Sequence, residues 1–524
     1  MPEHIRALAY VLILAIPAFL VAARLAVPLV GAREFALWRN AWIAATSLTF
    51  LSTSFLMFVA LLALLIVVLR KKLCQPLHLY IILMFTAPCL GVGVGIPGLF
   101  NRLIDLNPPR VLALLILLPM AVTLWAQPEM RRLRKLDIAV VAFCTMLSLL
   151  AFRHGDFNSI FRVIPGYWLD IVLSYFVFSR AVRTPADLDR CLMAFVVAAL
   201  PLALVGIFEY LRDWRIYFVV VLRWDLTLIS PYVFRDGSLR AAATAIEPIA
   251  FGFLCMVGAA ALLAIRSRKV GLIWWWLAMV MLVGGLFVSL SRGPWLGFAL
   301  CVVIVLLARP RLALALSLVA VPTAALMPYL GPVATIDRFI NLLPFIGHAD
   351  EGSEAYRSQL LESSWTVIGR NPWFGSMDFL SAPELQVLIQ GQGIIDIVNS
   401  YIQIALEYGL LSLGLFVVFF VAIVASLARL TLVNTPAKPP YHALLGLMLA
   451  ILFTIGTTSS VSIIPHIYWA LSGLSVAAVA MARARAHGAA SGLATKGQPE
   501  INGGPPEIAA LASAAPMRVL GRGI

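Results

Sequence analysis

Long runs of apolar residues recur along most of the chain and are separated by short polar segments. Runs of about 20 apolar residues are typical of membrane-spanning helices. Only helices or closed barrels satisfy the backbone in lipid, and the short alternating segments of a barrel are absent. The pattern therefore predicts an all-α polytopic membrane protein with about fourteen transmembrane helices, in a range of about 12–14. The expected spans are 7–31, 47–69, 78–99, 109–127, 137–152, 165–181, 191–210, 245–265, 271–290, 293–308, 312–329, 401–429, 441–458 and 463–482.

Basic residues gather in short clusters between these spans and predict the orientation of the chain. If the spans alternate, all of the clusters fall on one side, which the positive-inside rule assigns to the cytoplasm. We therefore expect both termini to be cytoplasmic, in a multi-pass protein of the bacterial inner membrane. The clusters lie at 70–72, 131–135, 180–190, 266–269, 309–311 and 483–485. The same alternation places four segments outside: 32–46, 153–164, 211–244 and one long periplasmic loop at 330–400.

The composition narrows the class of protein further. The chain is 62% hydrophobic and 12% charged, with a mean hydropathy of +0.96, which excludes an ordinary soluble protein. Many of the Lys and Arg residues fall in the clusters beside the spans, so the net charge of +14 does not predict nucleic-acid binding. The six cysteines lie in or beside apolar runs, where small apolar packing residues are expected.

Four regions are expected along the chain. Residues 1–210 hold N-terminal transmembrane helices, 211–430 form a core that includes the outer loop, and 431–485 hold C-terminal transmembrane helices. The tail 486–524 is rich in Ala, Gly and Pro without an apolar period, which predicts a disordered cytoplasmic segment.

Arg292 interrupts the apolar pattern between the runs 271–290 and 293–308, at the tip of a tight helical hairpin. A charge at membrane depth is costly and either reaches the interface or has a function. Arg240 and Arg357 are expected at the same outer face, where arginine side chains suit a phosphate group. The alternative is that arginines at helix ends simply extend to the interface. Further arginines are expected on this side: Arg212, Arg215 and Arg235.

Acidic residues are expected near the same face. Glu209 ends one span, Glu247 begins the next, and Asp170 lies near the outer end of its own span. Asp396 lies near the end of the long loop.

Three motifs resemble the O-antigen ligase and polymerase superfamily, which shares the Wzy-C domain. The segment 291–297 (SRGPWLG) is similar to the Ser-Arg-Gly signature that opens a span, and 369–375 (GRNPWFG) resembles the outer-loop Asn-Pro pattern. Asn399 and the Glu407-Tyr408-Gly409 sequence resemble the motif that enters the next span. A fourth similarity is Arg240 followed by Glu247-Pro248. The resemblance covers about 210–430. Each motif is short, so the resemblance depends mainly on the order in which the motifs follow one another.

The resemblance implies an enzyme that uses a glycan linked through diphosphate to undecaprenol, without a metal or other cofactor. Arg240, Arg292 and Arg357 would stabilise the departing diphosphate. Asp396, or as second choice Glu247, would act as general base on the acceptor hydroxyl. Membrane lipids, a flippase and a chain-length regulator are the other expected partners, and nucleic acid is not.

The position before Asn399 separates two branches of this superfamily. Ligases typically carry a histidine there, whereas this chain has Val398. The departure favours a polymerase that joins repeat units of a surface polysaccharide or exopolysaccharide. Two alternatives stay open: a ligase that transfers glycan to lipid A core or protein, and a lipid or polysaccharide transporter. A transporter would more often show paired repeats and broken helices around a midplane site.

Several other patterns predict no function. Asp187-Leu188-Asp189 is expected in a short cytoplasmic loop, and His348 and His466 as polar residues at the surface or interface. The 93–98 segment fits Gly-x-Gly-x-x-Gly, but it is expected at the end of an apolar span with no strand before it.

Overall fold

The computed structural model shows a chain made mostly of helices. Residues Met1–Met481 form one compact unit, and the contacts described below lie within it. The predicted span 312–329 and His348 lie outside the described residues. The structure describes 1–70, 75–96, 100–131, 134–226, 233–235, 237–265, 271–309, 351–390, 393–432 and 441–496.

Helices make up most of the described chain, as predicted. Among the described residues, seven helices are long and apolar enough to cross a membrane, and five shorter helices are also apolar. The first half contains α1 (Glu3–Val30), α2 (Ala32–Leu51), α3 (Phe55–Arg70), α4 (Pro76–Leu83), α5 (Pro108–Leu112), α6 (Leu118–Trp125), α7 (Pro128–Arg131), α8 (Lys135–Ala151), α9 (Phe157–Tyr167), α10 (Ser174–Ala181), α11 (Pro185–Arg212) and α12 (Phe218–Arg223). The second half contains α13 (Pro248–Ala264), α14 (Leu272–Val288), α15 (Arg292–Leu307), α18 (Glu351–Arg370), α19 (Pro383–Gln386), α20 (Ser400–Leu432), α21 (Tyr441–Ile455) and α22 (Ile464–Lys496).

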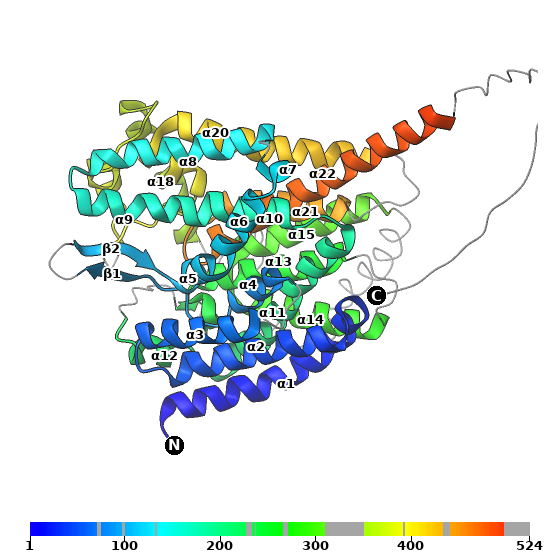
Figure 1. The fold of residues 1–524 in the computed structure, drawn as a ribbon. Helices are drawn as coiled ribbons and strands as arrows, with labels where there is room; N and C mark the ends of the chain where they lie inside the picture. The colour runs from blue at the N-terminus through cyan, green and yellow to red at the C-terminus, as the bar shows by residue number, and fades with distance from the viewer. Residues whose placement is uncertain are drawn as a thin grey trace, which may run out of the picture. The chain divides into compact units, whose positions relative to one another are not determined.

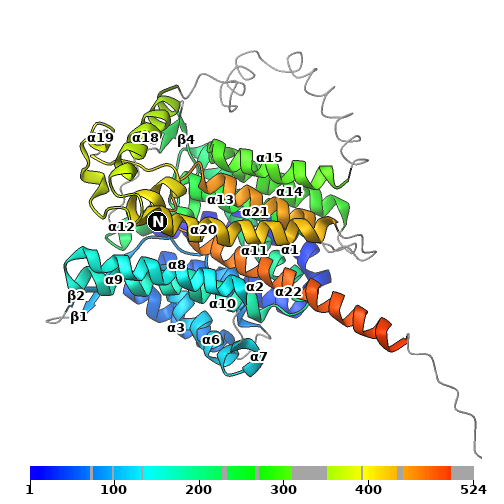
Figure 2. The same cartoon turned by 90° about the horizontal axis from the view of Figure 1, so that it is seen from above.

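The helix α11 lies at the centre and packs against α1, α4, α13 and α14 (Figures 1 and 2). It is apolar on all sides, so it can be surrounded by other helices. A second layer contains α13, α15 and α21, and α20 joins it to α8. Small residues allow close contacts between the helices. A Cβ at Gly446 of α21 would lie 3.0 Å from the Cys301 carbonyl of α15.

Two opposite ends of the helices carry different polar residues. At one end, which we call the basic face, Arg134 donates to the Ser179 carbonyl and Arg183 to Gln127. The clusters 131–135 and 180–190 therefore lie together, as predicted. At the other end, which we call the loop face, lie the turns and irregular segments that precede α13, α15 and α20.

The N-terminal topology differs from the prediction. Residues 32–51 form the helix α2 instead of an outer loop, and α3 is a separate helix after a break at Ser52. Arg223 of α12 donates to the Ser52 carbonyl and lies 3.4 Å from His4 Nδ1. The N-terminus and the 211–244 segment are therefore on the same side, so predicting a cytoplasmic N-terminus opposite that segment was wrong. The polar residues of α2 hid the additional helix, because they lower its hydropathy.

The predicted span 78–99 is also wrong. The helix α4 ends at Leu83, and the chain then runs through buried turns and extended backbone to a hairpin of β1 (Val92–Ile96) and β2 (Phe100–Leu106). The Gly-x-Gly-x-x-Gly segment therefore begins in a strand. Continuous hydrophobicity did not reveal the break, since the unwound residues 84–87 are buried within protein. A second small sheet pairs β3 (Phe234–Arg235) with β4 (Ser238–Leu239).

The described part of the long loop folds onto the start of α20. Apolar residues of α18, the 379–388 segment and α20 share one cluster, which includes Leu360, Phe379, Leu385 and Leu406. The helix α20 is interrupted at Gly409, where φ is +80° and ψ is 175°. At the C-terminus, α22 continues to Lys496, so residues 486–496 are helical where disorder was predicted.

Candidate active site

Several non-helical segments meet at the loop face. The Ala241 N–H donates to the Val288 carbonyl, and the Cys89 N–H donates to the Thr244 carbonyl. The Ser462 hydroxyl donates to the Ala245 carbonyl at 2.8 Å. Irregular backbone at membrane depth persists only where protein or a water-filled cavity surrounds it. The meeting point of these segments is therefore the strongest candidate for a site.

Two arginines from the segment before α13 hold the turn that leads to Arg292. The Arg240 side chain is buried, and its Nη2 donates to Ser291 Oγ at 2.9 Å. Its Nε is 3.4 Å from the Ser289 carbonyl, and Arg235 Nη1 donates to the Leu290 carbonyl at 2.7 Å. The structure thus brings Arg240 to the Ser-Arg-Gly motif and adds Arg235, which the sequence did not single out.

Arg292 is half-buried at the first position of α15, directly after the buried Ser291. The N-terminus of a helix carries partial positive charge on its backbone N–H groups. Gly293 follows, and a Cβ there would collide with Thr457 Oγ1. The Ser-Arg-Gly motif therefore combines a bond to Arg240, a cationic side chain and a close contact with Thr457, between α21 and α22.

Glu209 fixes the backbone that follows Arg240. Its carboxylate is buried at the end of α11 and accepts N–H bonds from Ala242 at 3.0 Å and Ala243 at 2.9 Å. It also accepts from the Ile216 N–H at 3.0 Å. Three backbone donors neutralise much of the cost of burying the carboxylate. Glu209 therefore has a structural role that the sequence did not predict.

Backbone strain is concentrated around this meeting point. Positive φ angles occur at the non-glycine residues Ala243 (45°), Ile246 (68°), Leu290 (47°) and Ser462 (55°). Such a conformation costs about 1–3 kcal/mol and persists where surrounding structure imposes it, often at functional sites. For a β-branched residue such as Ile246 it is especially uncommon.

A hydroxyl-rich segment between α21 and α22, Thr457–Ser462, connects the turn before Arg292 to Asp396. Ser459 Oγ donates to Asp396 Oδ1 at 2.8 Å, and Ser460 Oγ lies 2.7 Å from Ser400 Oγ. The sequence prediction placed these residues in the C-terminal region 431–485, outside the core, with 459–462 between the predicted spans 441–458 and 463–482. The available signal was the run of hydroxyl residues between two apolar stretches.

Asp396 is also held through its backbone. Tyr356 Oη donates to the Asp396 carbonyl at 3.0 Å and accepts from the Asp396 N–H at 3.1 Å. The adjacent Arg357 is exposed on α18. The structure therefore joins Asp396 to the 457–462 segment. Arg357 lies on the exposed side of α18, the helix that also carries Tyr356.

Glu247 and Asn399 lie at helix starts. Glu247 is the residue before α13, and the neighbouring Ile246 carbonyl accepts from Arg215 Nη2 at 2.5 Å. Burial holds the pKa of Arg215 below its usual value, and the nearby carboxylates of Glu209 and Glu247 oppose this effect only in part. Asn399 caps α20, because its Oδ1 accepts from the N–H groups of Tyr401 and Ile402. This accounts for Asn399 structurally.

The other family-like motifs lock together through glycines. A Cβ at Gly375 would lie 2.5 Å from the Leu406 carbonyl, and a Cβ at Gly409 would collide with the Trp373 backbone. Arg153, after α8, donates to the carbonyls of Phe374, Gly375 and Glu407 at 2.8–3.0 Å. The Glu407 side chain accepts from Tyr408 Oη at 2.5 Å.

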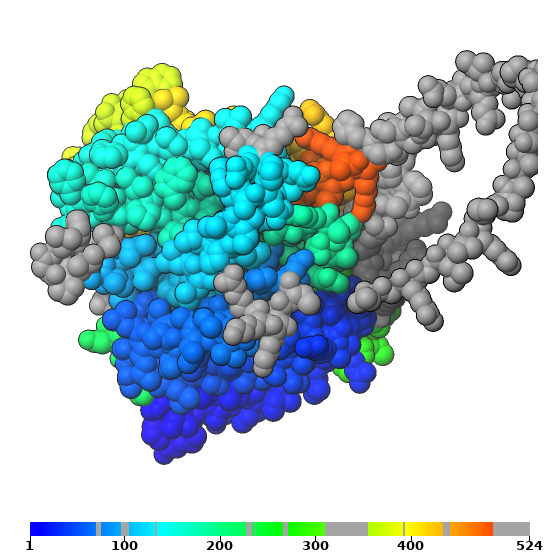
Figure 3. All heavy atoms as spheres, in the orientation of Figure 1, coloured from blue at the N-terminus to red at the C-terminus, as the bar shows by residue number. Residues whose placement is uncertain are grey.

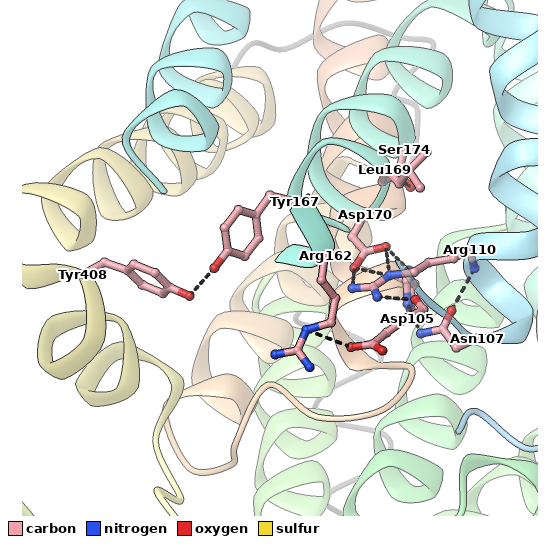
Figure 4. Close-up of polar contacts among 10 residues, drawn as sticks. Asp105, Asn107, Arg110, Arg162, Tyr167, Leu169, Asp170, Ser174 and Tyr408 are labelled. Carbon is pink, nitrogen blue, oxygen red and sulfur yellow. Dashed lines mark hydrogen bonds and ion pairs between the residues drawn. The ribbon is translucent and has the colours of Figure 1, made fainter. Parts of the chain in front are cut away.

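A polar cluster joins α5, the π-helical stretch that follows α9, and the start of α22 (Figure 4). Arg110 binds Asp170 with Nε and Nη2, the latter at 2.7 Å, and donates to the Asp105 carbonyl. His466 Nδ1 is 3.6 Å from Asp170 Oδ1, and the histidine is 3% exposed. Predicting His466 as a surface or interface residue was wrong, because Asp170 and Asn107 give it partners inside the protein.

Both helices that carry this ion pair contain a π-helical stretch, Ala113–Leu117 after Arg110 and Trp168–Leu173 around Asp170. Such stretches are frequent at functional sites. The other discounted motif is also structural: Asp187 forms a capping box with Thr184 at the start of α11. Asp187 therefore lies in the first turn of a helix, and predicting a loop for this motif was wrong because the sequence forms this cap.

The five described cysteines are buried and free, which confirms their predicted packing role. Among the described residues, no group of His, Cys, Asp and Glu could hold a metal ion.

The apolar helices and the arginine-lined turn between them define a multi-pass membrane protein with a polar site at one face. Residues 277–419 match the family model Wzy_C, described as O-antigen ligase, which supports the resemblance to the O-antigen ligase superfamily. Members are glycosyltransferase-like ligases and polymerases that act on lipid-linked glycans in membranes. No curated protein matches the chain.

Proposed function

We propose that the protein polymerises oligosaccharide repeat units linked through diphosphate to undecaprenol, at the periplasmic face of the inner membrane. The observation that supports this most directly is the bond from buried Arg240 to Ser291, directly before Arg292. Arginine, a helix N-terminus and strained buried backbone together suit an anion that arrives from the membrane.

In this mechanism an acceptor hydroxyl attacks the anomeric carbon of the donor sugar. The new carbon–oxygen bond forms as the bond to the lipid diphosphate breaks, and the electron pair leaves with the diphosphate. Arg240 and Arg292 stabilise that developing charge. Arg357 on α18 would meet the same group from the loop side.

Asp396 is the proposed base that takes the hydroxyl proton. It is held by Ser459 and Tyr356, and the 457–462 segment that carries Ser459 also contacts Gly293 beside Arg292. Glu247 remains the second choice, since it lies near Arg215 at the start of α13. The general base and the cation would thus act from two sides of one hydroxyl-rich segment.

The polymerase assignment depends on Val398, which stands where ligases of the family typically have histidine. The decisive experiment reconstitutes the purified protein with a lipid-diphosphate oligosaccharide and sizes the product. Longer chains on the carrier lipid are expected. Glycan released from the carrier onto lipid A core or protein would make it a ligase, and movement of intact substrate without transfer would make it a transporter.

A set of arginine variants tests the site itself. Arg292→Ala and Arg240→Ala should each lower turnover by about 100- to 1000-fold, the scale on which loss of one stabilising donor acts. Arg212→Ala is the matched control, because Arg212 is exposed at the end of α11. Normal turnover in a stably inserted Arg292→Ala protein would overturn the assignment.

A further inference from the structure

The ends of two long apolar helices indicate where the membrane surface lies on the loop face. The helix α8 has 17 residues, which is about 26 Å of helix. The part of α20 after Gly409 runs to Leu432, which is about 34 Å. Each begins or ends near basic residues of the opposite face, Arg134 for α8 and Arg429 for α20. The hydrocarbon core is about 30 Å thick, so Ala151 and Gly409 lie close to its edge.

Exposed aromatic residues gather at these two helix ends. Phe152 is 61% exposed at the end of α8, and Phe157 is 74% exposed at the start of α9. Trp373 and Phe374 are 61% and 50% exposed in the turn that packs against Gly409. The α8–α9 tip adjoins the region of α18 and α20, as the cyan and yellow atoms of Figure 3 show.

Arg153 joins the two groups of aromatic residues into one unit. It lies between Phe152 and Phe157, and its guanidinium donates to the carbonyls of Phe374 and Gly375 at 3.0 and 2.9 Å. The Leu410 N–H also donates to the Pro372 carbonyl at 2.7 Å, which fixes the turn on α20. The backbone that carries Trp373 and Phe374 is therefore held against the helix ends.

We propose that Phe152, Phe157, Trp373 and Phe374 form an interfacial anchor that sits in the headgroup–acyl boundary of the phospholipid bilayer. Phospholipid is the expected occupant because exposed apolar residues continue from the anchor down α20 through Leu411 and Val418. Tryptophan favours this depth because its ring is apolar and its N–H is polar, and phenylalanine rings are buried in the same boundary on the apolar face of interfacial segments.

The anchor would fix the height of the 351–399 segment above the membrane. That segment carries Asp396 and packs on α20 through Leu360, Phe379 and Leu385. A donor held in the bilayer by its lipid presents its sugar at a fixed depth, so a fixed segment height would help to align the two. The anchor itself does not depend on the proposed glycan transfer.

A depth measurement in phospholipid nanodiscs tests the proposal. A nitroxide is attached through an encoded ketone amino acid at Trp373 and, separately, at Phe157, and its access to oxygen and to a water-soluble nickel chelate is compared. Reference labels are placed at Val418, in the exposed middle of α20, and at Glu362, on the exposed polar side of α18. Each disc holds one protein copy.

The labels at 373 and 157 should lie at similar depths. Both depths should fall between the depth of the label at 418 and that of the label at 362. Nickel access at 373 as high as at 362 would overturn the anchor, since it would place the turn in water. Low access to both reagents would also overturn it, because protein instead of lipid would then cover the turn.

Discussion

Arg292 has its place because of the small and polar residues on either side of it. Ser291 accepts from Arg240, and Gly293 lets the Thr457 side chain approach the start of α15. The sequence predicted Arg240 and Arg292 as companions, and the structure brings Arg240 to the adjacent serine. Arg235 and Glu209 were expected at this face, but their contacts were not predicted, because these bonds go to backbone atoms that carry no sequence signature.

The carboxylate of Asp396 can be tested at the same scale. Asp396→Asn keeps the size of the side chain and the acceptor for Ser459, but it removes the base. Turnover should fall by about 100- to 10,000-fold if proton transfer is assisted there. Single-turnover assays with the lipid-linked donor measure the effect, with Asp378→Asn as a control in the same segment. Near-normal turnover would transfer the role to Glu247, which Glu247→Gln then tests.

Glu209 leads to a second prediction for single residues. Glu209→Gln replaces one oxygen by an amide that must face a backbone N–H group, so the bonds to Ile216, Ala242 and Ala243 cannot all remain. A loss of stability of about 1–3 kcal/mol is expected, as for a buried group left unsatisfied. The thermal transition of the purified protein measures it. An unchanged transition would mean that these bonds contribute little.

At the scale of helices, many contacts between elements are made where a helix is interrupted, and not only between helix faces. The extended residues after α4, the turn before α15 and the kink of α20 all lie where another segment crosses. Apolar periodicity identified most long helices but missed the break after Leu83, because a buried unwound segment is as apolar as a helix. It also missed α2, whose polar residues resembled a loop.

The interlock between the 371–375 turn and α20 gives a prediction at this scale. Gly409→Ala should destabilise the protein by about 1–3 kcal/mol or more, because the position needs a positive φ and has no room for a Cβ. The matched control is Gly414→Ala in the same helix, where a Cβ meets nothing within 4 Å. Thermal unfolding followed by tryptophan fluorescence compares the variants, and equal transitions would contradict the interlock.

The whole molecule places its first residues on the loop face. His4 lies beside Arg223, and Arg6 stacks on Trp214 at 5.1 Å. The prediction that both termini share the cytoplasmic side came from counting spans, and one additional helix reverses the result. Counting spans is sensitive in this way, because one missed or added span reverses the membrane side assigned to every segment that precedes it.

Labelling in intact membranes checks this arrangement. Glu3→Cys should react with a membrane-impermeant maleimide from the same side as Arg212→Cys, because both positions are exposed on the loop face. Glu129→Cys in α7, at the basic face, should react only from the other side. If Glu3→Cys labelled together with Glu129→Cys, the assigned position of α1 would be incorrect.

The sequence by itself determined the membrane class, most of the long helices and the motif that holds Arg292. Those features are local: an apolar run of sufficient length must be buried in lipid or protein, and a charge within it must be accounted for. The tertiary structure decided which distant segments meet. The bond from Ser459 to Asp396, the three N–H groups on Glu209 and the contact of Gly375 with Gly409 join residues by their positions in space. Backbone and hydroxyl groups make these contacts, and their geometry depends on packing that a linear pattern does not contain.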